Sequence, residues 1–190
     1  MELRALLTLQ DLATALRALT PLRILIDKEG ERYVELAPPS EVTLVEGAGL
    51  HVRTSGAVQW SVAGVGIRAN VLAVDVLLRP SVESSPRGPA LRFALELSNL
   101  DLQHSPGLVD STILGQVNAA LVDEENALRW YFAETLQVGT DLPRVLPKTH
   151  LEFQASGAQV SVTAAELILS MPVRFDVARD TDLQAQGTTP

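Results

Sequence analysis

The stretch VTAAELILSMPVRFDV, residues 162–177, decides the fold class by its alternation. From Leu167 onward every odd position is apolar, while most even positions hold a polar residue or a proline. Successive side chains of a strand point to opposite faces of a sheet, so this pattern predicts a long strand with one buried face and one mostly wet face. The apolar positions are Leu167, Leu169, Met171, Val173, Phe175 and Val177.

Segments earlier in the chain also favour strands. We expect the first two to pair as a hairpin, because the intervening KEGER is rich in polar and turn-forming residues. Gly56 lies in the middle of its segment and predicts a bend or bulge there. Several segments exceed the usual length of about five or six residues, so the sheet must coil strongly. The predicted strands lie within residues 21–27, 32–37, 41–47, 49–62, 66–83 and 90–103.

Helical periodicity replaces alternation in two places. Residues 8–19 carry leucines at helical spacing, with Thr8 able to cap the start and Pro21 marking the end. Residues 107–122 predict a second helix, and a further helical turn is expected near residues 125–137. The apolar positions of the second helix lie four residues apart, at Val109, Ile113, Val117 and Leu121.

The order of elements argues for one α+β domain. Residues 150–178 are expected to close the chain with two strands joined by a turn at Ser156 and Gly157. Strands therefore precede and follow the second helix without β-α-β alternation. We predict a long, strongly coiled antiparallel sheet wrapped around an amphipathic helix, a half-barrel or tube. The domain is expected to span residues 1–178, followed by a polar, disordered tail over residues 179–190.

Composition excludes several classes of function. The formal net charge is −8, and Lys28 and Lys148 are the only lysines, so a nucleic-acid role is rejected. The chain has no cysteine, which excludes thiolate metal sites and disulfides. It lacks a long apolar run and a signal-like start, so a cytoplasmic location is expected. Apolar residues reach 46% but aromatics only 4%, so an aliphatic core either packs through small residues or surrounds something else.

No known catalytic motif occurs in the sequence. His51, His104 and His150 are each alone in their segments, which gives no short metal-ligand spacing. We therefore expect no enzyme, no metal and no cofactor. An enzymatic alternative would need a site assembled from distant residues, such as His51, His104 and Asp110. The aromatic stretch RWYFAET, residues 129–135, fits a membrane interface or a partner surface, or else caps the core of the sheet.

The segment LELSNLDLQHSPGLVDSTILGQVNAAL, residues 95–121, runs from a strand through a Pro-Gly turn into an amphipathic helix. Together with the amphipathic strands that follow, it resembles the tubular lipid-binding (TULIP) superfamily. That group includes the SMP domains, the bactericidal/permeability-increasing proteins and small bacterial relatives. The resemblance covers residues 5–178 as a pattern of elements. We expect the chain to depart from the family in having no signal sequence or membrane tether, and it is also acidic.

The resemblance implies non-catalytic binding of a lipid, a fatty acid or another long hydrophobic ligand. The ligand would lie in an apolar groove between sheet and helix, and no cofactor would take part. For each of the predicted groove residues, the competing interpretation is an ordinary dry core. Those residues are Leu91, Phe93, Leu95, Ile113, Val117, Leu121, Leu169, Met171, Val173 and Phe175.

One alternative function is a protein-interaction or scaffold module. Such a module would have a closed dry core and would bind a partner, or a second copy as a homodimer, through a sheet edge or an apolar patch. Peripheral membrane contact is also conceivable, but the acidic charge does not support it.

Overall fold

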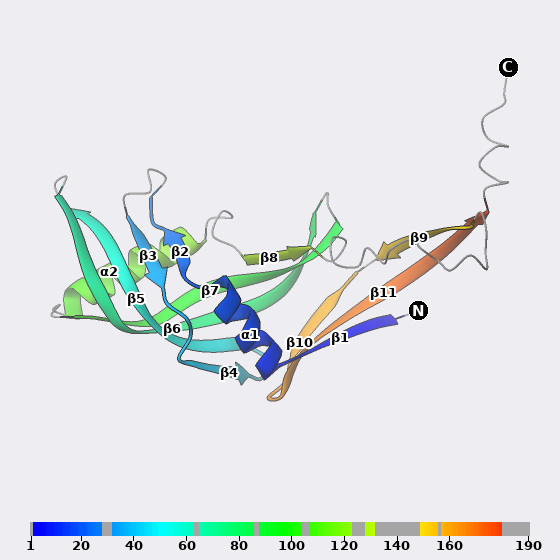
Figure 1. Cartoon of the computed structure of the whole chain (residues 1–190), viewed down its shortest axis with the longest axis horizontal. Helices are drawn as coiled ribbons and strands as arrows, with labels where there is room; N and C mark the ends of the chain where they lie inside the picture. Colours follow the sequence, from blue (N-terminus) through cyan, green and yellow to red (C-terminus); the bar gives the residue numbers. More distant parts are fainter. Residues whose placement is uncertain are drawn as a thin grey trace, which may run out of the picture.

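The computed structural model describes residues 2–27, 32–62, 65–85, 88–103, 107–122, 128–131, 149–155 and 157–179. These residues form an α+β fold whose strongly curled antiparallel sheet makes a half-barrel (Figure 1). The elements are β1 (Glu2–Thr8), α1 (Leu9–Leu19), β2 (Leu22–Leu25), β3 (Tyr33–Leu36), β4 (Glu41–Val45), β5 (Gly49–Val62), β6 (Val65–Ser85), β7 (Gly88–Leu102), α2 (Gly107–Leu121), β8 (Leu128–Tyr131), β9 (Thr149–Ala155), β10 (Gln159–Val162) and β11 (Glu166–Arg179).

The larger sheet runs in the order β2-β3-β5-β6-β7-β8, and β4 also pairs with β5. The predicted hairpin is confirmed, because β2 and β3 pair antiparallel. The predicted bulge is also confirmed, since the register of β5 against β6 shifts between Thr54 and Gly56. A Cβ atom at Gly56 would collide with the carbonyl oxygen of Glu35, so this position requires glycine. The bulge bends β5 and increases its local twist, which helps the sheet curl.

The smaller sheet joins the start of the chain to its last strand. β1 pairs with β11 from Glu2 opposite Pro172 to Thr8 opposite Glu166. β10 pairs with β11 as well, and β9 pairs with its far end. A strand over residues 2–8 was not predicted from the sequence. Its leucine, alanine and arginine residues are good helix formers, and pairing with β11 overrides that preference.

The end of the chain differs from the two strands predicted there. β9 and β10 follow each other in the chain, and both pair antiparallel with the same strand, β11. The hairpin turn lies at residues 163–165, where the Thr163 hydroxyl accepts hydrogen bonds from the backbone N–H groups of Ala165 (3.3 Å) and Glu166 (3.1 Å). The predicted turn at Ser156 and Gly157 is therefore not the hairpin turn. Gly157 has φ of 64° and lies in the break between β9 and β10.

The helical turn predicted near residues 125–137 is wrong where the structure describes it. Residues 128–131 form β8, which pairs with β7 from Phe93 opposite Leu128 to Ala90 opposite Tyr131. The rest of that predicted turn lies outside the described residues, as does residue Phe132. The predicted tail beyond Arg179 also lies outside them.

The helices predicted over residues 8–19 and 107–122 are both present. Thr8 caps α1 as expected: its hydroxyl accepts the N–H of Asp11 (3.3 Å), and the Asp11 carboxylate accepts the N–H of Thr8 (3.0 Å). α2 buries one face into the sheet through Ile113, Val117 and Leu121. The predicted amphipathic spacing of α2 thus corresponds to its packed face, except that Val109 is exposed.

A continuous hydrophobic core connects the helices and the two sheets. The main cluster includes Leu12 of α1, Val117 of α2 and Leu167 of β11, together with the inward residues of β3, β5, β6 and β7. A second cluster places Leu169 and Met171 of β11 against Leu91 of β7. The alternating face of residues 162–177 thus packs, over its described part, on the larger sheet.

Candidate functional site

Two adjoining pockets lie beneath α1. The larger has a volume of about 170 Å³ and the smaller about 40 Å³. They are adjacent because Leu16, Leu19, Leu78 and Leu128 line both of them. An apolar cavity of about 150 Å³ is large enough to hold a benzene molecule, so the larger pocket has room for a small hydrocarbon group.

The roof of the pockets is the apolar face of α1. Leu12, Leu16 and Leu19 follow one another at intervals of four and three residues and therefore share one side of the helix. Burial falls along this face: Leu12 is 6% exposed, Leu16 is half-buried and Leu19 is 55% exposed. Leu12 is thus packed into the core, whereas Leu19 in the last turn of α1 is largely exposed.

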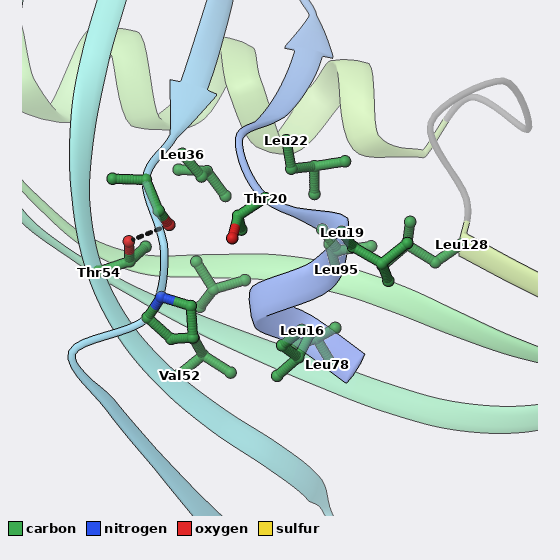
Figure 2. Close-up of a pocket in the computed structure, with 13 residues that line it drawn as sticks. Leu16, Leu19, Thr20, Leu22, Leu36, Val52, Thr54, Leu78, Leu95 and Leu128 are labelled. Atoms are coloured by element: carbon green, nitrogen blue, oxygen red, sulfur yellow. Dashed lines mark hydrogen bonds between the residues drawn. The ribbon is translucent and has the colours of Figure 1, made fainter. Parts of the chain in front are cut away.

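The floor comes from the inner face of the larger sheet, which we define by Leu50, Val52, Val76, Leu78 and Leu95. The register sets this face, because Leu50 lies opposite Leu78, which in turn lies opposite Leu95. Leu78 and Leu95 line the smaller pocket together with Leu16 and Leu19 of α1, and the two pairs overlap in the view of Figure 2.

The side walls come from three short strands. Leu22 and Leu36 close one side, from β2 and β3, and Leu128 of β8 closes the other (Figure 2). In the larger pocket Phe93 and Trp130 extend the wall formed by β7 and β8.

The polar groups of the lining are few and engaged. The Thr54 hydroxyl donates to the carbonyl oxygen of Ala37 (2.7 Å), the bond drawn in Figure 2. The Thr20 hydroxyl donates to the carbonyl oxygen of Arg17 (2.9 Å). Arg129 borders the larger pocket, and its Nε atom lies 2.6 Å from a carboxylate oxygen of Glu83. The interior of the pockets is therefore almost entirely hydrocarbon.

Comparison with known proteins shows weak likeness to solved structures. No protein-family model and no curated protein matches the chain. A crystal structure of lipopolysaccharide binding protein matches 94% of this chain and 50% of that chain, at 16% identity and a TM-score of 0.31. The chain thus spans about half the length of that protein. At this TM-score the likeness carries no argument, so the resemblance to the TULIP superfamily still rests on the sequence pattern.

The sequence-predicted groove residues fall into three groups. Phe93 and Leu95 line the pockets beneath α1. Ile113, Val117 and Leu121 are buried where α2 packs on the sheet, and they do not line these two pockets. Leu91, Leu169 and Met171 are buried together between the two sheets. The side chains of Val173 and Phe175 lie outside the described part of the structure. A ligand role for the residues outside the pockets stays a prediction.

Sequence reasoning missed the roof and most of the floor. Residues Leu12, Leu16 and Leu19 belonged to a correctly predicted amphipathic helix, but their spacing is equally typical of a packed core. The sequence did contain one indication, because it predicts two helices that each present an apolar face to the sheet. Periodicity identifies the apolar side of each helix and leaves open which helix packs tightly.

The outer face of the larger sheet carries a polar cluster around Asp75. The carboxylate of Asp75 accepts from Nε of Arg53 (3.0 Å) and from Nδ2 of Asn99 (3.4 Å), and its Oδ1 lies 3.6 Å from Nε2 of His51. These contacts, led by the hydrogen bond from Arg53, hold the pKa of Asp75 below its ordinary value of 3.8. The cluster lies on the opposite side of the sheet from the pockets, since His51 and Arg53 alternate with Leu50 and Val52.

The residues of the hypothetical enzymatic site are not all described. His51 belongs to the outer-face cluster, Asp110 lies in the first turn of α2, and His104 is outside the described residues. Within the described ranges no group of three or more histidine and acidic side chains is placed to hold a metal ion. Among the same residues, neither helix is long and apolar enough to cross a bilayer.

Proposed function

We propose that this chain binds a lipid or another long hydrophobic ligand without catalysing a reaction, and that the hydrocarbon part of the ligand lies beneath α1. The observation that carries the proposal is the open, almost wholly apolar space between α1 and the inner face of the sheet. Each methylene transferred from water into such a space contributes about 0.8 kcal/mol. The half-exposed leucines of α1 would be buried by the same event.

Trp130 offers a direct test because it lines the larger pocket, whereas Trp60 does not line either pocket. The sequence holds two tryptophans. A Trp60→Phe variant therefore leaves Trp130 as the only tryptophan. We expect its fluorescence to be quenched by a fatty acid brominated near the end of its chain, because bromine quenches on contact.

The matched control is Trp130→Phe, in which Trp60 alone reports. Its emission should be unaffected by the same brominated fatty acid. Equal quenching of both single-tryptophan variants would indicate nonspecific association, and absence of quenching in both would refute binding at this site.

A blocking substitution tests the location independently. Leu16→Glu places a charge in the lining, and burying a charge without a partner is strongly unfavourable, so quenching of Trp130 should be lost. Ala18→Glu introduces the same charge on the exposed side of α1 and should leave quenching unchanged. Equal behaviour of the two variants would place the ligand elsewhere.

A further inference from the structure

We propose, resting on the function proposed above, that the pocket recognises only the hydrocarbon end of its ligand. It takes about six to eight carbons of an alkyl chain and leaves the headgroup in water, whatever the charge of that headgroup. The first argument is volume: about 170 Å³ in the larger pocket exceeds the space that holds six carbons of benzene, and the adjoining 40 Å³ extends it slightly.

The second argument is that no charge points into the pocket from its described lining. Arg129 is the charged residue among the lining residues. It lies directly opposite Arg92 in the pairing of β7 with β8, whereas Leu128 and Trp130 lie opposite Phe93 and Leu91. Strand alternation therefore puts the Arg129 side chain on the outer face, where Glu83 binds it at 2.6 Å.

The third argument concerns the hydroxyl groups. Thr20 and Thr54 both donate their protons to backbone carbonyl oxygens, so neither has a proton to offer to a carboxylate or a phosphate. A buried anionic headgroup would lose its hydration without gaining a donor here, which costs more than the apolar contacts around it return.

The open end of the pocket provides a place for the headgroup. Leu19 lines both pockets and yet is 55% exposed, so the last turn of α1 forms part of the rim that water reaches. A chain inserted with its methyl end against Leu78 would leave its polar end at this rim.

A chain-length series measured by calorimetry tests the proposal. The probes are straight-chain carboxylates of four to sixteen carbons. Up to about eight carbons the dissociation constant should fall about fourfold with each methylene, the ratio that corresponds to transferring one methylene from water. Beyond that length the gain should drop below about twofold per methylene, because further carbons stay in water. A fourfold gain that continued to sixteen carbons would overturn the proposal in favour of a long tube.

The headgroup is tested at a fixed length of eight carbons. Octanoate, octanol and octyltrimethylammonium should bind with dissociation constants that agree within about threefold. A preference above tenfold for any one of them would overturn the proposal by indicating a headgroup site.

Filling the pocket supplies an internal check. Leu78→Phe enlarges a side chain that lines both pockets, so the length at which the gain levels off should shorten by about two carbons. Leu72→Phe is the matched control on the same strand, because Leu72 is exposed and lines neither pocket. An unchanged plateau in Leu78→Phe, with the fold intact by circular dichroism, would contradict the assignment.

The outcomes separate this inference from the proposed function. If no probe of any length binds and Trp130 is not quenched, the proposed function itself fails. If the probes bind but depend on headgroup, or gain affinity without a plateau, the function stands and the end-recognition proposal fails.

Discussion

Asp75 is an acidic residue that the protein keeps 8% exposed in the middle of its longest described strand. Its neighbours make this possible. Arg53 and Asn99 flank it in the register row Arg53–Asp75–Asn99, and the register of β6 against β7 shifts immediately after Asp75. Hydrogen bonds from Arg53 and Asn99 therefore take the place of water around the ionised carboxylate.

The depressed pKa of Asp75 makes a contribution to stability that depends on pH. The unfolded chain has the ordinary value of 3.8 and the folded chain a lower one, so the contribution is complete above 3.8 and is lost as pH falls through the folded value. We expect Asp75→Asn to lower the free energy of unfolding by about 1 kcal/mol at pH 7, a modest loss because Arg53 is half exposed.

Urea unfolding at pH 7, 5 and 3 measures this dependence. The gap between the original protein and Asp75→Asn should be equal at pH 7 and 5 and should begin to close at pH 3. Two curves that stayed parallel down to pH 3 would show that the Asp75 carboxylate titrates identically in both states.

At the scale of elements, α2 covers an edge of the sheet that β8 leaves open. β8 pairs with β7 only from Ala90 to Phe93. Farther along β7, the backbone N–H of Leu97 donates to Oδ1 of Asn118 (2.8 Å), and Nδ2 of Asn118 donates to the carbonyl oxygen of Leu97 (2.8 Å). The side-chain amide thus replaces the peptide group of a missing strand and fixes α2 against β7.

Removing that amide has a calculable cost. Asn118→Leu leaves the N–H and carbonyl groups of buried Leu97 without these partners, so we expect a loss of about 2 kcal/mol in the free energy of unfolding. Gln116→Leu, at an exposed position of the same helix, should change stability by less than about 0.5 kcal/mol. Chemical denaturation of both variants decides the matter, and equal midpoints would mean that Asn118 is dispensable.

How well an element could be predicted depended on where its stabilising contacts lie in the sequence. α1 was predictable because its cap, Thr8 with Asp11, and its apolar spacing are local. β1 and β8 were not, because each is a strand only through a distant partner, β11 and β7 respectively. Residues 128–131 also lie in a segment where neighbouring alanine and glutamate residues favour a helix.

For the site, periodicity correctly placed Phe93 and Leu95 on the inner face of the sheet, and both line the pockets. The sequence did not predict that α1 covers these two residues. α1 and α2 both present apolar faces to the sheet, and α2 packs tightly through Val117 while α1 leaves Leu19 exposed. That difference arises from tertiary packing of the whole molecule, which a single helix pattern does not contain.

On the scale of the whole molecule, the two sheets are joined by buried side chains. Leu169 and Met171 of the smaller sheet pack on Leu91 of the larger one, and Leu167 belongs to the main core. The loop before β5 adds a hydrogen bond from the N–H of Gly47 to the carbonyl oxygen of Val162 (3.0 Å). We therefore propose that residues 1–178 fold as one domain.

Shortening a buried side chain between the two sheets tests whether they form one domain. Met171 is 1% exposed, so Met171→Ala should cost about 3 kcal/mol by leaving a cavity. If the sheets form one cooperative unit, circular dichroism and the Trp130 fluorescence of the Trp60→Phe protein should report one coincident transition that shifts to lower denaturant. Ser161→Ala, at an exposed position of β10, serves as control. Two separate transitions, of which only one moved, would indicate two domains.

The pairing of β1 with β11 also affects when β1 can fold during synthesis. The partner of β1 follows it by roughly 160 residues, which a ribosome adds in roughly 8 to 30 s. Until β11 has been synthesised, β1 lacks its partner, and other strands can contact Leu3, Leu6 and Leu7. Glu2 and Arg4, interspersed among them, discourage such encounters. Of the strands described, β1 is the first in the chain and pairs with the last, so it cannot reach its final pairing until β11 has been made.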